Sequence, residues 1–520
     1  MCVRARIGRS VTRTSAGSLA LDGGSLDLAT FAEVVLGGRP VELSAPARDG
    51  VRRARATVEA AVASGEAVYG VNTGFGNLAN VRIPTRDLET LQERLLLSHA
   101  AGTGEPLDEP EVRGMLLLRA NTLARGHSGV RVAVIEGLVR LLNEGVAPVV
   151  PSRGSVGASG DLAPLAHLAL PLIGRGEVFH RGARRPALEA LREIGMEPLV
   201  LAPREGLGLI NGTQAMTSLL ALTVLEARRL VRIADLVGAL STDAFRGADT
   251  AFDARVHAVR PHPGQLASAG NLWRLMAGSA IRASHREADV RVQDPYSFRC
   301  MPQVHGAVRD VLADVERKLA VEMNAATDNP LVFADSGAML SGGNFHGEPM
   351  ALAADFLAIA LAELGSISER RTEKLTNDAF SGLPPFLVES AGLNSGFMMA
   401  QVTAAALVSE NKTLAHPASV DSIPTSADKE DHVSMGMWAA IKGRQVAANV
   451  RTILAIELLA SAQGVDLLRP LRSSGPLEKL HAAVRARVPK WVEDREMSPD
   501  IAAAEAFLAG PVDELLDELQ

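Results

Sequence analysis

The sequence predicts a mainly α-helical protein in which a smaller, loop-rich N-terminal domain precedes a long central helical bundle. The chain has 520 residues, 47% of them hydrophobic, so it can bury a substantial core. Five long segments rich in Ala and Leu repeat their apolar residues at about the 3.6-residue period of a helix. These segments are 216–240, 305–325, 350–375, 397–414 and 435–468. Several are apolar on more faces than a lone surface helix requires, which favours a bundle with further faces buried between subunits.

The N-terminal domain begins with short apolar runs and Gly pairs between residues 19 and 42, a pattern typical of small strands and turns around one helix. A helix is predicted from Pro46, which suits a first helical turn, to Ser64. It leads into YGVNTGFG at 69–76, which is too rich in Gly for regular structure. Helical periodicity then predicts a helix over Leu88–His99.

No repeat, low-complexity region or shift in composition marks a linker. The predicted units are a tail at 1–18, an N-terminal domain at 19–215 and a helical bundle with C-terminal helices at 216–520. Four arginines lie within the first thirteen residues, which superficially resembles an organelle transit peptide. Because this segment lacks an amphipathic stripe, the sequence favours a disordered or over-extended start.

Charge and cysteine content favour small-molecule chemistry in the cytoplasm. The net charge of −7 provides no basic field to hold nucleic acid or an anionic membrane. Cys2 and Cys300 are too few for a disulfide framework or a zinc site, which indicates a reducing compartment. The longest apolar run, 350–364, contains Asp355 and Glu363 and falls short of the roughly 20 residues that cross a bilayer, so no membrane span is predicted.

The stretch GSVGASGDLAPLAHLAL at 154–170 places small residues at the start of a predicted helix. In a tight bend, the amide nitrogen of Gly160 can attack the carbonyl carbon of Ala158. Loss of two waters, one of them from the Ser159 side chain, then leaves a five-membered electrophilic ring. Gly160 suits the attacking position because it has no Cβ and tolerates strained dihedrals. The alternative is an ordinary flexible loop in which Ser159 or Asp161 caps the helix.

The chain has only two tyrosines, Tyr69 in YGVNTGFG and Tyr296 in QDPYSFRC. A phenol can give or take a proton, and desolvation or a nearby charge can move its pKa. One tyrosine alone is usually a packing residue. Because both lie within distinctive motifs, we predict that their hydroxyl groups have a function.

The stretch at 154–170 resembles the signature of the aromatic amino-acid ammonia-lyases, whose Ala-Ser-Gly tripeptide matures into 4-methylidene-imidazol-5-one (MIO). Six further blocks resemble the same family in the same order: YGVNTGFG (69–76), LSHAAG (97–102), LINGTQ (209–214), VQDPYSFRCMPQV (292–304), SGGNFHGEP (341–349) and SENKTLAHPASVDSIPTSADKEDHVSMG (409–436). Within the family they most resemble the histidine ammonia-lyases. The resemblance implies that the N-terminal domain carries the MIO loop, that no external cofactor is used, and that the chain forms a homotetramer with shared active sites.

The resemblance also implies a role for each matching residue in converting L-histidine to trans-urocanate and ammonia. Those in or beside the reaction are Ala158, Ser159 and Gly160 as the electrophile, Tyr69 as the base, Tyr296 in the shell around the electrophile, and Glu430 near the substrate ring. Those implied in substrate binding are His99 with Glu430 for the imidazole, Asn211 and Gln293 for the electrophile and amine, Arg299 for the carboxylate, and Phe345 beside the electrophile.

Residue chemistry agrees with several of these roles. The planar guanidinium of Arg299 suits a carboxylate, although a surface salt bridge is an alternative. The amide of Asn211 can donate and accept, although it could instead cap a helix beginning near Thr213. Burying an unpaired carboxylate costs several kcal/mol, so a phenyl ring would leave Glu430 unsatisfied whereas an imidazole N–H would pair with it.

Three other functions remain open from the sequence: a tyrosine or phenylalanine ammonia-lyase, an MIO-dependent aminomutase, and a catalytically inactive helical assembly protein. Ser98-His99 and Glu430 argue against the first, and the intact tripeptide argues against the last. The His and Glu side chains in these blocks could suggest a metal site. None has HExxH spacing or a CxxC partner, so we predict no metal.

Overall fold

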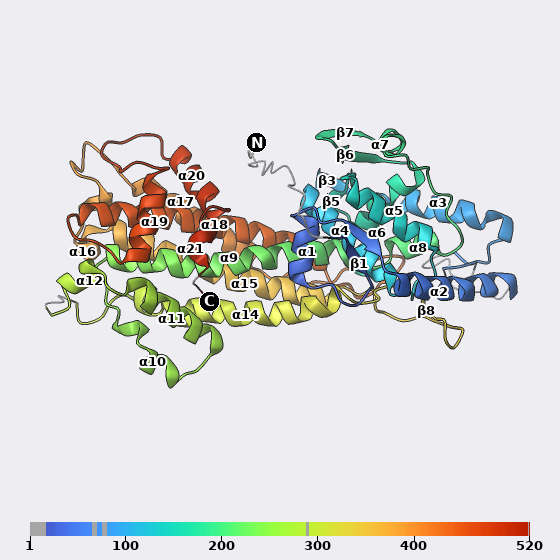
Figure 1. Ribbon diagram of the computed structural model, residues 1–520, viewed down its shortest axis with the longest axis horizontal. Coiled ribbons are helices and arrows are strands. Elements are labelled where there is room, and N and C mark those ends of the chain that lie inside the picture. Colours follow the sequence, from blue (N-terminus) through green and yellow to red (C-terminus); the bar gives the residue numbers. More distant parts are fainter. Residues whose placement is uncertain (1–16, 65–69, 75–80, 288–290, 518, 520) are drawn as a thin grey trace. The chain divides into compact units, whose positions relative to one another are not determined.

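The computed structural model describes residues 17–64, 70–74, 81–287, 291–517 and 519 (Figure 1). The chain forms two compact units, each assembled from three stretches of sequence. The first, here called the loop unit, comprises Met1–Leu222, Arg317–Ala354 and Pro417–Ile441; the second, the bundle unit, comprises Thr223–Glu316, Asp355–His416 and Lys442–Gln520. The predicted boundary between residues 215 and 216 stays a prediction. Residues 1–16 of the predicted tail lie outside the described part of the chain.

Four long helices contribute residues to both units, because four of the five division points fall inside them; the fifth, between His416 and Pro417, follows α17 (Met398–Leu414). They are α9 (Gln214–Ala244), α14 (Met301–Glu322), α15 (Glu348–Thr376) and α18 (Gly436–Leu467). Together with α17, they confirm the five long helices predicted from apolar periodicity. Their ends differ from the predicted ends by only a few residues, as expected where helices fray.

The loop unit combines short helices with small sheets. Its helices are α1 (Leu28–Val35), α2 (Ala45–Ser64), α3 (Leu88–His99), α4 (Glu109–Ala124), α5 (Val132–Asn143), α6 (Leu162–Ala169), α7 (Ala187–Glu193) and α8 (Glu205–Ile210). Its strands are β1 (Leu19–Leu21), β2 (Val41–Leu43), β3 (Thr103–Pro106), β4 (Ala147–Pro148), β5 (Pro151–Arg153), β6 (Glu177–His180), β7 (Ala183–Pro186), β8 (Leu331–Phe333) and β9 (Ala338–Leu340). The pairs are β1 with β2 in parallel, and β3 with β5, β4 with β6, β6 with β7, and β8 with β9 antiparallel. The predicted small strands around one helix near the start are therefore confirmed.

Helix α4 lies in the core of the loop unit and was not predicted. Asp108 and Glu111 form a capping box at its start, and a proline occupies its first turn. Every residue from Glu111 to Ala124 is buried. Because α4 has no polar face, its sequence lacks the amphipathic period from which helices are usually predicted. The sequence RANTLARGHSGVR at 119–131 indicates only a scaffold role, and α4 contains its first half.

The bundle unit holds parts of the four long helices together with shorter ones. The shorter helices are α10 (Ala254–Ala258), α11 (Pro263–Met276), α12 (Ala280–Ser284), α13 (Tyr296–Arg299), α16 (Asp378–Ser381), α17, α19 (Gly475–Arg485), α20 (Ser498–Leu508) and α21 (Asp513–Leu516). Local capping defines several starts: the Ser279 side chain accepts from Arg282 N at α12, and Ser474 accepts from Leu477 N at α19.

One of the buried charge clusters between the helices of the bundle unit is centred on Glu457. Glu457 on α18 accepts from Arg371 Nε at 2.5 Å and Nη2 at 2.8 Å, and from the hydroxyls of Ser241 and Ser368 at 2.5 Å each. These bonds join α18 to α9 and α15. Glu457 and Arg371 are both completely buried, so the ion pair between them offsets the free energy of hydration that each side chain loses on burial.

Among the described residues, one helix, α15, has the length and hydropathy to cross a bilayer. It is 29 residues long, longer than the apolar run noted in the sequence, and 67% of its apolar window is buried inside the protein. It also carries Arg371, which pairs with Glu457 in the core. This burial and pairing favour a core helix of the bundle.

Candidate active site

The tripeptide Ala158-Ser159-Gly160 lies on the loop between β5 and α6. Gly154, Gly157 and Gly160 have φ values of +143°, +68° and +71°, in the region that residues with a Cβ rarely adopt. The glycine at every third position therefore meets a backbone requirement of this bend. The bend ends at Asp161, the residue immediately before α6.

Gly160 is pressed against the backbone of Gly212, which follows α8. A Cβ built on Gly160 would lie 2.1 Å from Gly212 O, and the two residues form an isolated parallel bridge. The next amide, Asp161 N, donates to Gly212 O at 2.7 Å. Both the positive φ and the close contact therefore exclude any side chain at the residue whose nitrogen would close the ring.

The Ser159 side chain meets a carboxylate that is distant in sequence. Its Oγ donates to Glu430 Oε1 at 2.6 Å, and the Thr425 hydroxyl donates to Glu430 Oε2 at 2.6 Å. Asn211 Nδ2 donates to Ser159 O at 2.9 Å. Asn211 ends α8, and α9 begins at Gln214, so the Asn211 side chain holds the tripeptide rather than capping a helix start.

Asp161 is completely buried, and its side chain makes no capping bond to α6. Its carboxylate instead accepts from Met216 N at 2.9 Å, at the start of α9, and from Ser155 Oγ at 2.8 Å. Burial raises the pKa of Asp161 to about 6, and the two hydrogen bonds oppose that rise. The alternative in which Ser159 or Asp161 caps α6 from a flexible loop is therefore wrong.

His99 is the last residue of α3. Its Nδ1 lies 2.9 Å from Leu95 O and 3.1 Å from Ser98 Oγ. A carbonyl can only accept, so Nδ1 carries the hydrogen and Nε2 is left as an acceptor. Burial lowers the pKa of His99, while the Leu95 hydrogen bond and the charge of Glu430 oppose that fall. His99 and Glu430 are therefore close enough for the charge of Glu430 to act on the imidazole.

Gln293, Tyr296 and Arg299 belong to the bundle unit. Arg299 Nε donates to Asp294 O at 2.9 Å, and its guanidinium lies 4.5 Å above the Tyr296 ring. Asp294 is itself fixed by Ala248 N at 2.6 Å. These contacts orient the guanidinium through Nε, so its two terminal nitrogens can bind a carboxylate as a fork.

Phe345 is half-buried on the loop that precedes α15. This loop is joined to the tripeptide loop by a hydrogen bond from Gly347 N to Gly157 O at 3.1 Å. Ser434, on the loop before α18, also donates from Oγ to Gly157 O at 2.8 Å, and a Cβ on Gly347 would lie 2.7 Å from that Oγ, so the three loops pack closely. The predicted base, Tyr69, lies outside the described residues.

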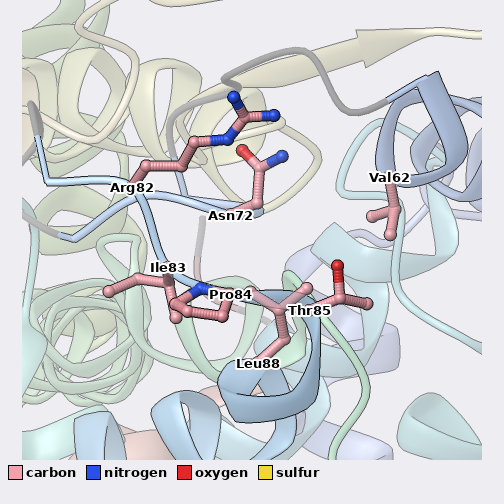
Figure 2. Close-up of a pocket in the computed structure, with 7 residues that line it drawn as sticks. All are labelled: Val62, Asn72, Arg82, Ile83, Pro84, Thr85 and Leu88. Atoms are coloured by element: carbon pink, nitrogen blue, oxygen red, sulfur yellow. The ribbon is translucent and has the colours of Figure 1, made fainter.

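Two of the cavities among the described residues of the loop unit lie near motif blocks. One of about 220 Å³ is lined by Val62, Asn72, Arg82, Ile83, Pro84, Thr85 and Leu88 (Figure 2). It includes Asn72 from the YGVNTGFG block but none of the predicted site residues. The other, of about 390 Å³, is lined by Glu322, Ala325, Ala326, Thr327, Gly343, Asn344, His346, Glu348 and Pro349, so it flanks Phe345. Within the described ranges, no three His, Cys, Asp or Glu side chains gather in a way that could hold a metal ion.

A family model, described as aromatic amino acid lyase, matches residues 26–486. The chain belongs to the aromatic amino acid lyase family. A histidine ammonia-lyase of Anaeromyxobacter sp. (strain K) is 56% identical over 499 residues, which cover 94% of this chain and 98% of the relative. The crystal structure of histidine ammonia-lyase from Trypanosoma cruzi aligns with a TM-score of 0.89 and 46% identity over 96% of this chain and 95% of that one. Tyrosine aminomutase from Streptomyces globisporus aligns with a TM-score of 0.92 and 39% identity over 97% and 99% of the two chains.

Some residues that shape this aromatic amino acid lyase site were missed in the sequence. Thr425 holds the second oxygen of Glu430, and Ser155 holds Asp161. Thr425 lies in the same block as Glu430, which was the one available signal. Gly212 lies in the LINGTQ block, but nothing in that block indicates its contact with Gly160, which depends on tertiary structure.

Proposed function

We propose that this lyase eliminates ammonia from L-histidine to give trans-urocanate, using an electrophile that the chain forms from Ala158, Ser159 and Gly160. The hydrogen bond from Ser159 to Glu430 carries the proposal, because it brings an imidazole-binding carboxylate to the tripeptide. The names of the relatives support the same substrate. Residue roles at the site follow as parts of this proposal.

The residues present suit formation of MIO. The left-handed bend at Gly160 and the backbone against it leave no room for a side chain. The Ser159 hydroxyl, which must be lost, lies beside a carboxylate rather than in an apolar pocket. Once formed, the group supplies an electron-poor carbon that no ordinary side chain offers.

Glu430 would change partners when the Ser159 hydroxyl is lost. Its Oε1 loses its donor, while Oε2 remains held by Thr425. The released oxygen can accept an imidazole N–H, and His99 presents Nε2 as a second acceptor. An imidazolium has two N–H groups to match these acceptors, whereas a phenyl ring has none.

The remaining roles concern the amino-acid part of the substrate. Arg299 would bind the carboxylate through its two terminal nitrogens, and Tyr69 would remove the β-proton. Asn211 and Gln293 would hydrogen-bond near the amine. Positioning groups in this way can lower a barrier by several kcal/mol, up to roughly 7–11.

The proposal includes a homotetramer whose copies complete each other's sites. Two large side chains of the segment that carries Tyr296 are exposed in a single chain: Val292 is 101% and Tyr296 70% exposed. A further stripe on α15, formed by Leu352, Phe356 and Ile359, is also exposed. Such surfaces are typical of faces buried by another subunit.

An aminomutase is the second candidate, because the tyrosine aminomutase structure aligns with a TM-score of 0.92. The deciding experiment incubates the purified enzyme with L-histidine, L-tyrosine or L-phenylalanine, and follows the conjugated acrylate by absorbance and any β-amino acid by chromatography. Acrylate from histidine alone is expected. Acrylate from an aryl substrate would overturn the ring-binding roles of His99 and Glu430, and a β-amino product would indicate the mutase.

A further inference from the structure

Arg119 lies in the middle of α4 and is completely buried, but none of the roles above involves it. Its guanidinium donates from Nη1 to Asn211 O at 2.9 Å and to Gln214 Oε1 at 2.9 Å, and from Nη2 to Gly208 O. It therefore binds both the last turn of α8 and the turn that leads into α9. This is the turn whose Asn211 side chain holds Ser159 O.

Gly212 lies between this arginine and the tripeptide. A Cβ on Gly212 would lie 2.5 Å from Arg119 Nη1 and 2.8 Å from Thr327 Oγ1. A Cβ on Gly160 would lie 2.1 Å from Gly212 O. The guanidinium, the Gly212 backbone and the Gly160 backbone are thus in successive contact, with no flexible side chain between them to absorb a displacement.

Ion pairing alone does not account for Arg119. Its closest carboxylate oxygen, on Asp328, is 3.9 Å away, and the other oxygen of Asp328 is bound by Arg204 at 2.8 Å. Burial lowers the pKa of Arg119 to about 10, and Asp328 only partly opposes that fall. Its strong hydrogen bonds go instead to backbone carbonyls and to Gln214.

We propose that Arg119 is a positioning residue for formation of the electrophile: it holds the 211–214 turn against Gly160, so that the tripeptide stays bent for ring closure. This inference rests on the proposed function, since it assumes that the tripeptide cyclises. Arg119 touches none of the reacting atoms. Its contribution is to restrict the freedom of the turn, which keeps the reacting groups aligned.

The reaction that it would assist is balanced without an oxidant or reductant. A bond forms between Gly160 N and the Ala158 carbonyl carbon. The Ala158 oxygen leaves as water with the amide hydrogens of Gly160 and Ser159. Ser159 Oγ then leaves as a second water with its own hydrogen and the Cα hydrogen, which creates the exocyclic double bond.

The test is the intact mass of the folded, purified protein, because maturation removes the mass of two waters whether or not the enzyme turns over. Arg119→Met is compared with Arg113→Met. Arg113 is also a buried arginine of α4, but it binds Val34 O, Val35 O and Leu142 O, on another side of the helix. Thermal unfolding and gel filtration of both variants report how far each loses stability.

Arg119→Met should mature about tenfold to a hundredfold more slowly than wild type, the range expected for losing hydrogen bonds to a charged group. Arg113→Met should mature at the wild-type rate despite a comparable loss of stability. Equal maturation in both variants, or equal failure in both, would overturn the specific role of Arg119. If Arg119→Met does not fold, Arg119→Lys retains the charge without the planar fork, and wild-type maturation in that variant would contradict the inference.

The wild-type mass separates this inference from the proposed function. A wild-type chain without the loss of two waters would overturn the electrophile itself. A matured wild-type chain together with a normally maturing Arg119→Met would overturn only the role of Arg119. Ser159→Ala marks the mass of a chain that cannot lose the second water.

Discussion

Two sets of buried charges, one in each unit, are bound in different ways. In the bundle unit, every carboxylate oxygen of Glu457 and Asp235 is bound by side chains: Asp235 accepts from Ser268 and His305 on one oxygen, and from Asn271 and Arg309 on the other. In the loop unit, Arg119 Nε, Arg204 Nε and Asp328 Oδ2 have no hydrogen-bond partner among the described residues, and Arg119 binds mostly backbone carbonyls.

This difference separates two uses of a buried charge. Saturated pairs between side chains fix helices against one another, as Glu457 does for α9, α15 and α18. A guanidinium bound to backbone carbonyls instead fixes the path of a loop. Both units contain buried polar atoms without a hydrogen-bond partner among the described residues, for example Arg119 Nε in the loop unit and Arg309 Nε in the bundle unit. The two clusters therefore differ in what the charged group binds, and the loop that Arg119 holds is the proposed reactive one.

The largest effect is expected from Ser159→Ala, which changes chemistry without touching the bundle. Turnover should be abolished because the second dehydration needs the hydroxyl, whereas stability should change by no more than about 1 kcal/mol, since the matured wild type has also lost this hydroxyl and its hydrogen bond. Product formation and thermal unfolding of the purified variant measure the two quantities. Wild-type turnover in this variant would remove the proposed mechanism.

The next largest effect is expected in the bundle unit. Glu457→Leu leaves Arg371 buried without its partner, which should lower stability by about 3–5 kcal/mol. The double variant Glu457→Leu/Arg371→Met should recover most of that loss, because no charge remains to be compensated. Denaturant unfolding of both variants tests this. Equal losses in the single and double variants would show that the pair does not act as a saturated unit.

A pH series compares one buried aspartate from each unit. Burial raises the pKa of Asp161 and of Asp243 to about 6, and Ser473 and Ser279 oppose the rise at Asp243. Each folded pKa lies above the unfolded value, so each group's stabilisation is complete below about pH 4 and is lost as the pH rises to about 6, by roughly 2–3 kcal/mol.

Asp161→Asn and Asp243→Asn should each remove this fall from the stability measured between pH 4 and 7. At Asp161 the amide oxygen can accept from Met216 N while the amide nitrogen donates to the Ser155 hydroxyl, and the serine hydroxyls around Asp243 can likewise rotate to suit an amide. Both variants should therefore be close to wild type in stability at pH 4. A wild-type pH slope retained in either variant would contradict its assignment.

The smallest effect is expected from Glu430→Gln. The amide keeps an oxygen for one hydroxyl but loses the charge, so kcat/KM for L-histidine should fall about tenfold, or about 1.4 kcal/mol. Stability should change by no more than about 0.5 kcal/mol, because Glu430 is only half-buried. Steady-state kinetics beside thermal unfolding checks both. A large loss of stability would contradict this prediction and would show that the charge of Glu430 stabilises the fold, as the charge of Glu457 does.

Local pattern explains which parts of the fold were predictable. Helix α3 (Leu88–His99) has the bounds that the sequence predicted, because its apolar period and the residues that end it are features of the local sequence. Helix α4 was missed since burial on all faces removes that period. The segment Arg317–Ala354 belongs to the loop unit because it packs against residues that are distant in the sequence, and a local sequence pattern carries no information about such contacts.

The site shows the same limit. The tripeptide and Glu430 could be recognised by motif, but the hydrogen bonds that Ser159 and Thr425 donate to Glu430 could not be predicted from the sequence. Arg119 gave no signal as a site residue, since its partners Gly208 and Asn211 lie on a different element. Motifs identify the reacting groups, whereas the residues that hold them in place emerge only from packing.

The contact of Gly160 with Gly212, supported by Arg119 and Thr327, also has a consequence for biosynthesis. A growing polypeptide exposes its Ala-Ser-Gly long before the ribosome has added Thr327. Until then the nascent chain carries an ordinary serine, inert toward cellular thiols and amines. Under the proposed function, the reactive group would thus form only in chains that have folded as far as Thr327, and a chaperone or protease that meets an unfinished copy would handle an unmodified peptide.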